Sequence, residues 1–278
     1  MLDIVIDTII DLLKIIPFLF VAFLLMEYLE HSISKKRNIL KDSKLGPVIG
    51  SILGVIPQCG FSVMATNLFS AKNITMGTLI AIYLSTSDEM LPILITNKVS
   101  FKLIITILLI KVITGIVFGY LIDLIFRKKD KVKKDLPICK RDECHCEKGI
   151  FKSSIIHTLK ISLYILLTTF ILNTLVYLIG EDTISKILLK NSFFGPFLAS
   201  LVGLIPNCSA SIILTELYLS GVITTGMLIG GLLTGAGIGI LVLFKVNKDK
   251  KENLFILLSI YLIGVLIGIL LDLFKFSL

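Results

Sequence analysis

The chain has 278 residues, of which 55% are hydrophobic, and its mean hydropathy is +0.94. Soluble domains are less apolar, so the composition excludes an ordinary soluble protein and indicates an integral membrane protein. The net charge of +8 is concentrated in residues 127–152, where ten Lys and Arg accompany five Asp and Glu. One short basic loop between apolar halves argues against nucleic-acid binding.

Apolar stretches predict four segments in each half of the chain. In chain order the first half has a long helix over 4–29, a Pro-interrupted segment over 46–71, a long helix over 74–96 and a final helix over 101–126. The second half has the same order over 153–179, 195–220, 224–244 and 254–274. The acidic start, without early Lys or Arg, does not fit a signal peptide.

The two halves repeat one another. "GPVIGSILGVIPQCGFSV" begins at Gly46 and "GPFLASLVGLIPNCSASI" begins at Gly195, an offset of 195 − 46 = 149 residues. Eight of the eighteen aligned positions are identical. We therefore expect membrane repeat 1 over 1–126, a charged cytoplasmic linker over 127–150 and membrane repeat 2 over 151–278. Duplicated halves with matching interrupted segments are typical of secondary transporters.

Charge decides how the Pro-interrupted segments cross. A full crossing would place the basic loop 35–44 opposite the basic linker, against the positive-inside rule. A re-entrant hairpin instead places loop 35–44, the linker and the lysines of 245–251 all in the cytoplasm. The sequence therefore predicts an all-α fold of inverted repeats, each with three transmembrane helices and a re-entrant hairpin, or about ten helical segments. It places the protein in the cytoplasmic (inner) membrane with both termini outside.

The predicted hairpin tips carry matching motifs. They are Pro57-Gln58-Cys59-Gly60 and Pro206-Asn207-Cys208-Ser209. Proline removes a backbone donor and interrupts a helix. The half-helices that follow would point their N-termini, with free N–H groups and partial positive charge, at the middle of the membrane.

Hydroxyl groups follow each tip at helical spacing. Ser62 and Thr66, and likewise Ser211 and Thr215, are four residues apart and share one helix face. Together with the Cys59 and Cys208 sulfurs and the Gln58 and Asn207 amides, they form a candidate substrate site. Thiolates select soft metals and metalloids, whereas helix N-termini suit an anion. The alternative is that Pro and Cys are ordinary occupants of a packed kink.

Ionisable residues inside the third and fourth segments are candidates for coupling. Asp88 and Glu89 lie deep in 74–96, and Lys111 lies at a matching depth in 101–126, so we expect Asp88 and Lys111 to face each other. They would couple transport to protons or bind the cation. The alternative is a structural ion pair.

The linker holds Cys139, Cys144, His145 and Cys146 in "CKRDECHCE". Cysteine and histidine at short spacing bind zinc or softer ions, although this pattern fits no standard zinc-finger spacing. The segment is either a metal-delivery or sensing patch or a charged loop with incidental thiols.

At "GVIPQCGFSV", "STSDEMLPIL", "GLIPNCSASIILTELYLSG" and the Cys/His-rich loop, the chain resembles the ten-helix heavy-metal exporters. Members of that family are also labelled arsenic efflux proteins or manganese transporters. The doubled Pro-x-Cys motif is similar to that of permeases linked to organoarsenical export. The resemblance covers essentially the whole chain. It implies export of a heavy metal or metalloid, carried here by Pro57, Cys59, Pro206, Cys208, Asp88 and Glu89.

We therefore expect a secondary-active permease, not an enzyme, that binds a metal or metalloid ion in the lipid bilayer and needs no cofactor. The chain has no Walker-type loop for ATP hydrolysis. A small anion or thiol compound is the alternative cargo, and a metal sensor or a thiol oxidoreductase is a further alternative. Homo-oligomerisation, the cargo, the direction and the coupling ion are left open by the sequence.

Overall fold

The computed structural model describes residues 45–55, 59–87, 90–126, 194–206 and 208–274, with isolated positions between 16 and 24 and between 155 and 170. These ranges contain helices and no strands. The isolated positions lie in the helices predicted over 4–29 and 153–179 and are themselves helical. The rest of those two segments and the linker lie outside the described residues.

Five described helices belong to each half. In the first half they are α2 (Gly46–Gly54), α3 (Cys59–Ser70), α4 (Met76–Ser85), α5 (Met90–Thr96) and α6 (Phe101–Phe126). In the second half they are α10 (Gly195–Gly203), α11 (Cys208–Leu219), α12 (Thr225–Thr234), α13 (Ile238–Val246) and α14 (Lys250–Leu273). The offset of 149 residues carries α2, α3 and α4 onto α10, α11 and α12 with identical bounds.

Three described helices are long and apolar enough to cross a membrane: Phe101–Phe126, Thr225–Val246 and Lys250–Leu273. The second of these takes in both α12 and α13. Met76–Ser85 and Ala210–Leu219 are shorter apolar helices. The all-helical, membrane-spanning character expected from composition is therefore present in the described part of the chain.

The prediction of one continuous helix over 74–96 and another over 224–244 is wrong. Each is interrupted near its middle, so that α4 ends at Ser85 and α5 begins at Met90, while α12 ends at Thr234 and α13 begins at Ile238.

In the first half, hydroxyl groups end α4. The Ser85 and Thr86 hydroxyls both donate to the Ile82 carbonyl oxygen, at 3.0 and 2.8 Å, and the backbone of Thr86 is extended. The Ser87 hydroxyl donates to the Val55 carbonyl oxygen at 2.6 Å. Such side chains offer the backbone an alternative to helical hydrogen bonds.

In the second half, glycine makes the interruption. Gly237 has a φ of 59°, in the left-handed region where only glycine is free of strain. The Ala236 N–H donates to the Thr234 carbonyl oxygen at 2.8 Å instead of continuing the helical pattern.

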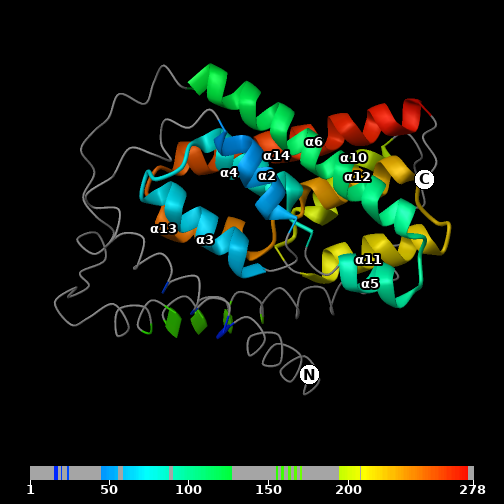
Figure 1. Cartoon of the computed structure of the whole chain (residues 1–278), viewed down its shortest axis with the longest axis horizontal. Helices are drawn as coiled ribbons and strands as arrows, with labels where there is room; N and C mark the ends of the chain where they lie inside the picture. Colours follow the sequence, from blue (N-terminus) through cyan, green and yellow to red (C-terminus); the bar gives the residue numbers. More distant parts are fainter. Residues whose placement is uncertain are drawn as a thin grey trace.

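The helices of each half pack in the order α2, α4, α6 and α10, α12, α14 (Figure 1). Small residues allow this close packing. Gly77 of α4 lies against the backbone of Gly119 in α6, and Gly226 of α12 lies against Gly268 in α14. The remaining helices pair across the halves, α3 with α13 and α5 with α11, on opposite sides of Figure 1.

The helix directions follow from which residues approach each other. Gly46 lies against Thr78 and Gly54 against Ser85, so α2 runs alongside α4 in the same direction. The second half repeats this arrangement, with Gly195 against Met227 and Gly203 against Thr234.

Matching carboxylates cap α4 and α12. The Thr75 hydroxyl and the Gly77 N–H donate to the Asp123 carboxylate at 2.7 and 2.8 Å. Thr224 and Gly226 make the same bonds to Asp272 at 2.9 and 3.0 Å. We call these two ends of the bundle the Asp123 end and the Asp272 end.

The start of α14 differs from the predicted residue 254. Asp249 caps the helix, because its carboxylate accepts from the Lys251 and Glu252 N–H groups at 3.0 and 3.2 Å. Glu252 also forms an ion pair with Lys72 across 3.4 Å. The ring centroids of Phe126 and Phe255 lie 4.7 Å apart, which places the last turn of α6 beside the first turns of α14.

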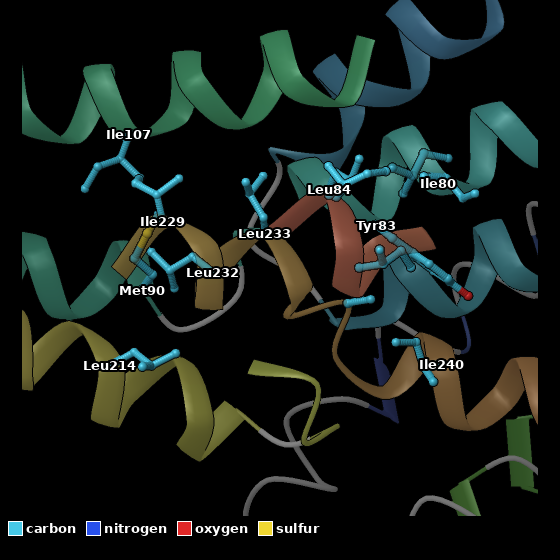
Figure 2. Packing of buried hydrophobic residues seen from close by; sticks show 14 of the residues in the cluster. Ile80, Tyr83, Leu84, Met90, Ile107, Leu214, Ile229, Leu232, Leu233 and Ile240 are labelled. Carbon is cyan, nitrogen blue, oxygen red and sulfur yellow. The ribbon is translucent and has the colours of Figure 1, made fainter. Parts of the chain in front are cut away.

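One apolar core joins the two halves. Figure 2 shows Ile80, Tyr83 and Leu84 of α4 in the same cluster as Ile229, Leu232 and Leu233 of α12. Met90, Leu214 and Ile240 extend this cluster to α5, α11 and α13. The interruptions of α4 and α12 are therefore buried between the halves.

Candidate functional site

A small cavity lies where the interrupted segments meet. Its described lining comes from the residues after α4 and the start of α5, the end of α10 and the start of α11 with the turn between them, the end of α12 and the residues after it, and the middle of α6. The lining residues are Thr86, Ser87, Met90, Lys111, Gly203, Ile205, Ala210, Ser211, Gly231, Leu232, Gly235 and Gly237. The cavity volume is about 10 Å³, close to what one water molecule requires. It therefore has the size for a single small ion or water.

Lys111 is the charged residue in this lining. Its side chain is 1% exposed, and its ammonium donates to the carbonyl oxygens of Thr86 and Leu232, the latter at 2.8 Å. Thr86 follows α4, and Leu232 belongs to the last turn of α12. The Lys111 ammonium thus forms hydrogen bonds to one carbonyl at the helix interruption of each half.

Two of the predicted site residues, Lys111 and Ser211, line the cavity, and Asp88, the expected partner of Lys111, lies outside the described residues. The Thr215 hydroxyl donates to the Ser211 carbonyl oxygen at 2.7 Å, one turn earlier in α11. In half one, the Thr66 hydroxyl makes the matching bond to Ser62 at 2.7 Å.

Thr66 has further partners that the sequence did not indicate. Its oxygen lies 2.6 Å from the Tyr83 hydroxyl and 3.2 Å from the Gly239 carbonyl oxygen, to which it donates. Because the single Thr66 proton is directed at carbonyl oxygens, Tyr83 acts as the donor to Thr66. Thr66 therefore joins α3 to α4 and to the first turn of α13.

The helices that follow the predicted tips begin at the cysteines. α3 starts at Cys59 and α11 at Cys208, and Gly60 and Ser209 occupy the second positions of these helices. Pro206 lies in the turn before α11 and is half-buried. The sequence predicts these starts near Gly60 and Ser209, so each helix begins one residue earlier than expected, directly after Pro-x.

The remaining predicted site residues lie outside the described residues. They are Pro57, Gln58, Asp88, Glu89, Asn207, Cys139, Cys144, His145 and Cys146. Across the described part of the chain, no three His, Cys, Asp or Glu side chains come together as a metal site.

Sequence reasoning missed the second pair of interruptions, with Thr86, Ser87 and Gly235. The signal was present, because "STS" at 85–87 and "TGA" at 234–236 are unusual runs of hydroxyl and small residues inside apolar segments and align at the repeat offset. Both runs weaken a helix for local reasons.

Long apolar helices, interrupted helices that meet in the bundle and a buried cation beside a small cavity are features of a multi-pass membrane transporter. The chain belongs to the family described as "Putative, 10TM heavy-metal exporter", which matches residues 1–178. This confirms the family that the sequence motifs suggested. No curated protein and no solved structure shows detectable similarity to the chain.

Proposed function

We propose that this protein is a secondary-active exporter that carries a heavy-metal ion or metalloid through the cavity between the two halves. The observation that carries the proposal is the convergence of interrupted segments from both halves on one cavity. Irregular backbone at membrane depth is tolerated where it is buried in protein or lines a cavity, and transporters bind cargo at such places.

The proposed arrangement is an inverted repeat with two re-entrant hairpins, α2–α3 and α10–α11. In support, α2 runs alongside α4 from the Asp123 end, and α3 returns to that end, where Ser70 donates to the Val246 carbonyl oxygen at 3.1 Å. In half two, α10 starts beside Met227 at the Asp272 end, and α11 leads back to Thr224 at the same end.

Cys59 and Cys208 are the proposed cargo ligands, one at the start of each hairpin's second helix. A thiolate at a helix N-terminus is stabilised by the helix dipole and binds soft ions. Gln58, Asn207, Ser62, Ser211, Thr66 and Thr215 would supply amide and hydroxyl contacts, and Asp88 and Glu89 would couple the transport to protons. The linker cysteines and His145 would deliver the ion from the cytoplasm.

Alternating access would open the two ends in turn. At the Asp123 end, α3 is held to half two by the Ser70–Val246 bond and the Lys72–Glu252 ion pair. The repeat partners of Ser70, Lys72 and Glu252 are Leu219, Gly221 and Leu103, which cannot form these contacts. The Asp272 end therefore lacks the matching polar connections and is the end that we expect to open more readily.

The test is the whole-cell content of Mn, Zn, Cu, Cd and arsenic, measured by mass spectrometry at matched expression. We expect the wild type to lower one element and Cys59→Ser/Cys208→Ser to abolish that effect, while Thr106→Ala, which lies outside the proposed site, serves as the control. An unchanged content in every strain would contradict metal export and favour a small anion or thiol compound. A double variant as active as the wild type would exclude the cysteines as ligands.

A further inference from the structure

The position of the Lys111 ammonium defines a second site, which does not depend on the identity of the cargo. Lys111 lies near the middle of α6, and its side chain is 1% exposed. Two of the oxygens that its ammonium contacts are backbone carbonyls, those of Thr86 and Leu232. Neither belongs to α6, since one comes from each half of the molecule.

Both carbonyls are at interruptions, where the regular helical pattern is lost. The Ala236 N–H, which would serve the Leu232 carbonyl in a continuous helix, donates to Thr234 instead. Thr86 follows the last residue of α4, and its own backbone is extended rather than helical. Carbonyls at the C-terminal end of a helix carry partial negative charge, and unwound carbonyls coordinate Na⁺ in secondary transporters.

An ammonium group suits such a place. The lysine side chain ends in a compact point charge with three donors, comparable in charge to a free monovalent cation. Its four-carbon stem reaches the carbonyls from α6 without taking up the cavity, which keeps a volume of about 10 Å³ beside it.

The repeat partner of Lys111 carries no charge. Position 260, at the offset of 149, is Ile260, which is 0% exposed in α14. The partners of Thr86 and Leu232 are Gly235 and Tyr83. Helix packing in this fold is therefore compatible with an apolar side chain at this depth, so packing alone does not require a lysine here.

We propose that the carbonyl oxygens of Thr86 and Leu232 form a monovalent-cation site that Lys111 fills as a tethered cation. The protein then needs no free Na⁺, K⁺ or ammonium to hold the two interruptions together. Shortening the side chain empties the site, and a free monovalent cation takes the place of the missing ammonium.

The experiment measures thermal unfolding of the purified full chain in detergent. Wild type and Lys111→Ala are compared in ammonium, methylammonium, sodium and potassium chloride, each against N-methylglucamine chloride at equal ionic strength. Lys111→Ala is expected to unfold at a lower temperature and to recover at least about 2 °C in one of the small cations. In the same salt, the unfolding temperature of the wild type is expected to rise by less than half as much as that of Lys111→Ala.

Two variants separate a cation site from a packing effect. Lys111→Met fills the space with an apolar chain and should show no recovery. Ile260→Ala opens a similar space at the repeat position without these carbonyls and should show none either. If Lys111→Ala is not recovered folded, Lys111→Ser is used, because its short side chain also leaves the place of the ammonium open to a free cation.

The proposal would be overturned if each cation raised the unfolding temperature of all variants equally. It would also be overturned if no cation raised the unfolding temperature of the folded short-chain variant, Lys111→Ala or its substitute Lys111→Ser. Since the readout is unfolding, a failure of metal export leaves this result unaffected. If a small cation stabilises Lys111→Ala but the wild type does not change the metal content of cells, the cation site is retained and the proposed export function is rejected.

Discussion

The Thr75 hydroxyl donates to the Asp123 carboxylate across 2.7 Å, and 149 residues later Thr224 makes the same bond to Asp272 across 2.9 Å. Thr75 also caps α4 directly, since its oxygen accepts from the Thr78 N–H at 3.1 Å. One carboxylate thus serves both the cap residue and the Gly77 N–H. The Thr75–Asp123 hydrogen bond thus connects the start of α4 to the last turns of α6.

Replacing Asp123 with alanine should lower the free energy of unfolding by about 1–3 kcal/mol, because two hydrogen bonds to a charged acceptor are lost. Asp272→Ala should cost a similar amount if the two ends are equivalent. Thr106→Ala is the control, because Thr106 bonds only its own helix, at the Lys102 carbonyl. Denaturant titration of the reconstituted protein measures all three. A cost for Asp123→Ala no larger than that of the control would show that the cap is dispensable.

The Lys72–Glu252 ion pair, at 3.4 Å, is predicted to hold the Asp123 end closed. Both side chains are partly exposed, so Glu252→Gln should change the unfolding free energy by less than about 1 kcal/mol. It should nevertheless raise the labelling rate of a cysteine placed at Asn67, which is 8% exposed and bonds within α3. Lys248→Gln, a charge change in the neighbouring loop, is the control. An unchanged labelling rate in Glu252→Gln would exclude a gating role for the pair.

Ser51 and Ser200 are repeat partners whose hydroxyls are buried and have no hydrogen-bond partner among the described residues. A buried polar group without a partner costs free energy. Ser51→Ala and Ser200→Ala should therefore each raise the free energy of unfolding, by about 1 kcal/mol. Ser85→Ala, which removes a bonded hydroxyl, should move in the opposite direction. If both Ser51→Ala and Ser200→Ala lowered the free energy of unfolding, each hydroxyl would have to possess a hydrogen-bond partner, and the prediction would be wrong.

Gly77 tests the close packing of α4 on α6. A side chain at this position would meet the Gly119 carbonyl and the Asp123 carboxylate, so Gly77→Ala must displace backbone as well as the cap. We expect a loss of about 3 kcal/mol or failure to accumulate in the membrane. Gly235→Ala is the control, because a Cβ atom added there would lie 3.6 Å from the nearest atom, an ordinary contact distance. Equal accumulation of the two variants would contradict this account.

Several boundaries could be predicted because their causes are local. The helices α2 and α10 end at Gly54 and Gly203, three residues before the motif prolines, and α3 and α11 begin at Cys59 and Cys208, one residue before the predicted Gly60 and Ser209. The bounds of α6 agree with the prediction because no proline interrupts its largely apolar sequence. The start of α14 was missed, since the charged Lys250 and Lys251 appeared to belong to a loop, whereas Asp249 caps a helix that includes them.

The interruption of α4 could not be predicted with the same ease. The hydroxyls of Ser85 and Thr86 act locally, but Ser87 bonds Val55, which lies 32 residues earlier and is brought close only by the packing of α2 on α4. Hydrophobicity alone favours a continuous helix there, and the competing hydrogen bonds are decided by tertiary contact.

Hydrophobicity, repeat spacing and the Pro-x-Cys motif are properties of the amino-acid sequence, so the membrane class, the duplication and the family could all be predicted from it alone. Tertiary structure decided what the buried polar groups bind. Lys111 reaches Leu232, 121 residues away, and Thr66 reaches Gly239, 173 residues away. A buried hydrogen bond needs a partner within about 3 Å. Only the packing of one half against the other brings these partners together.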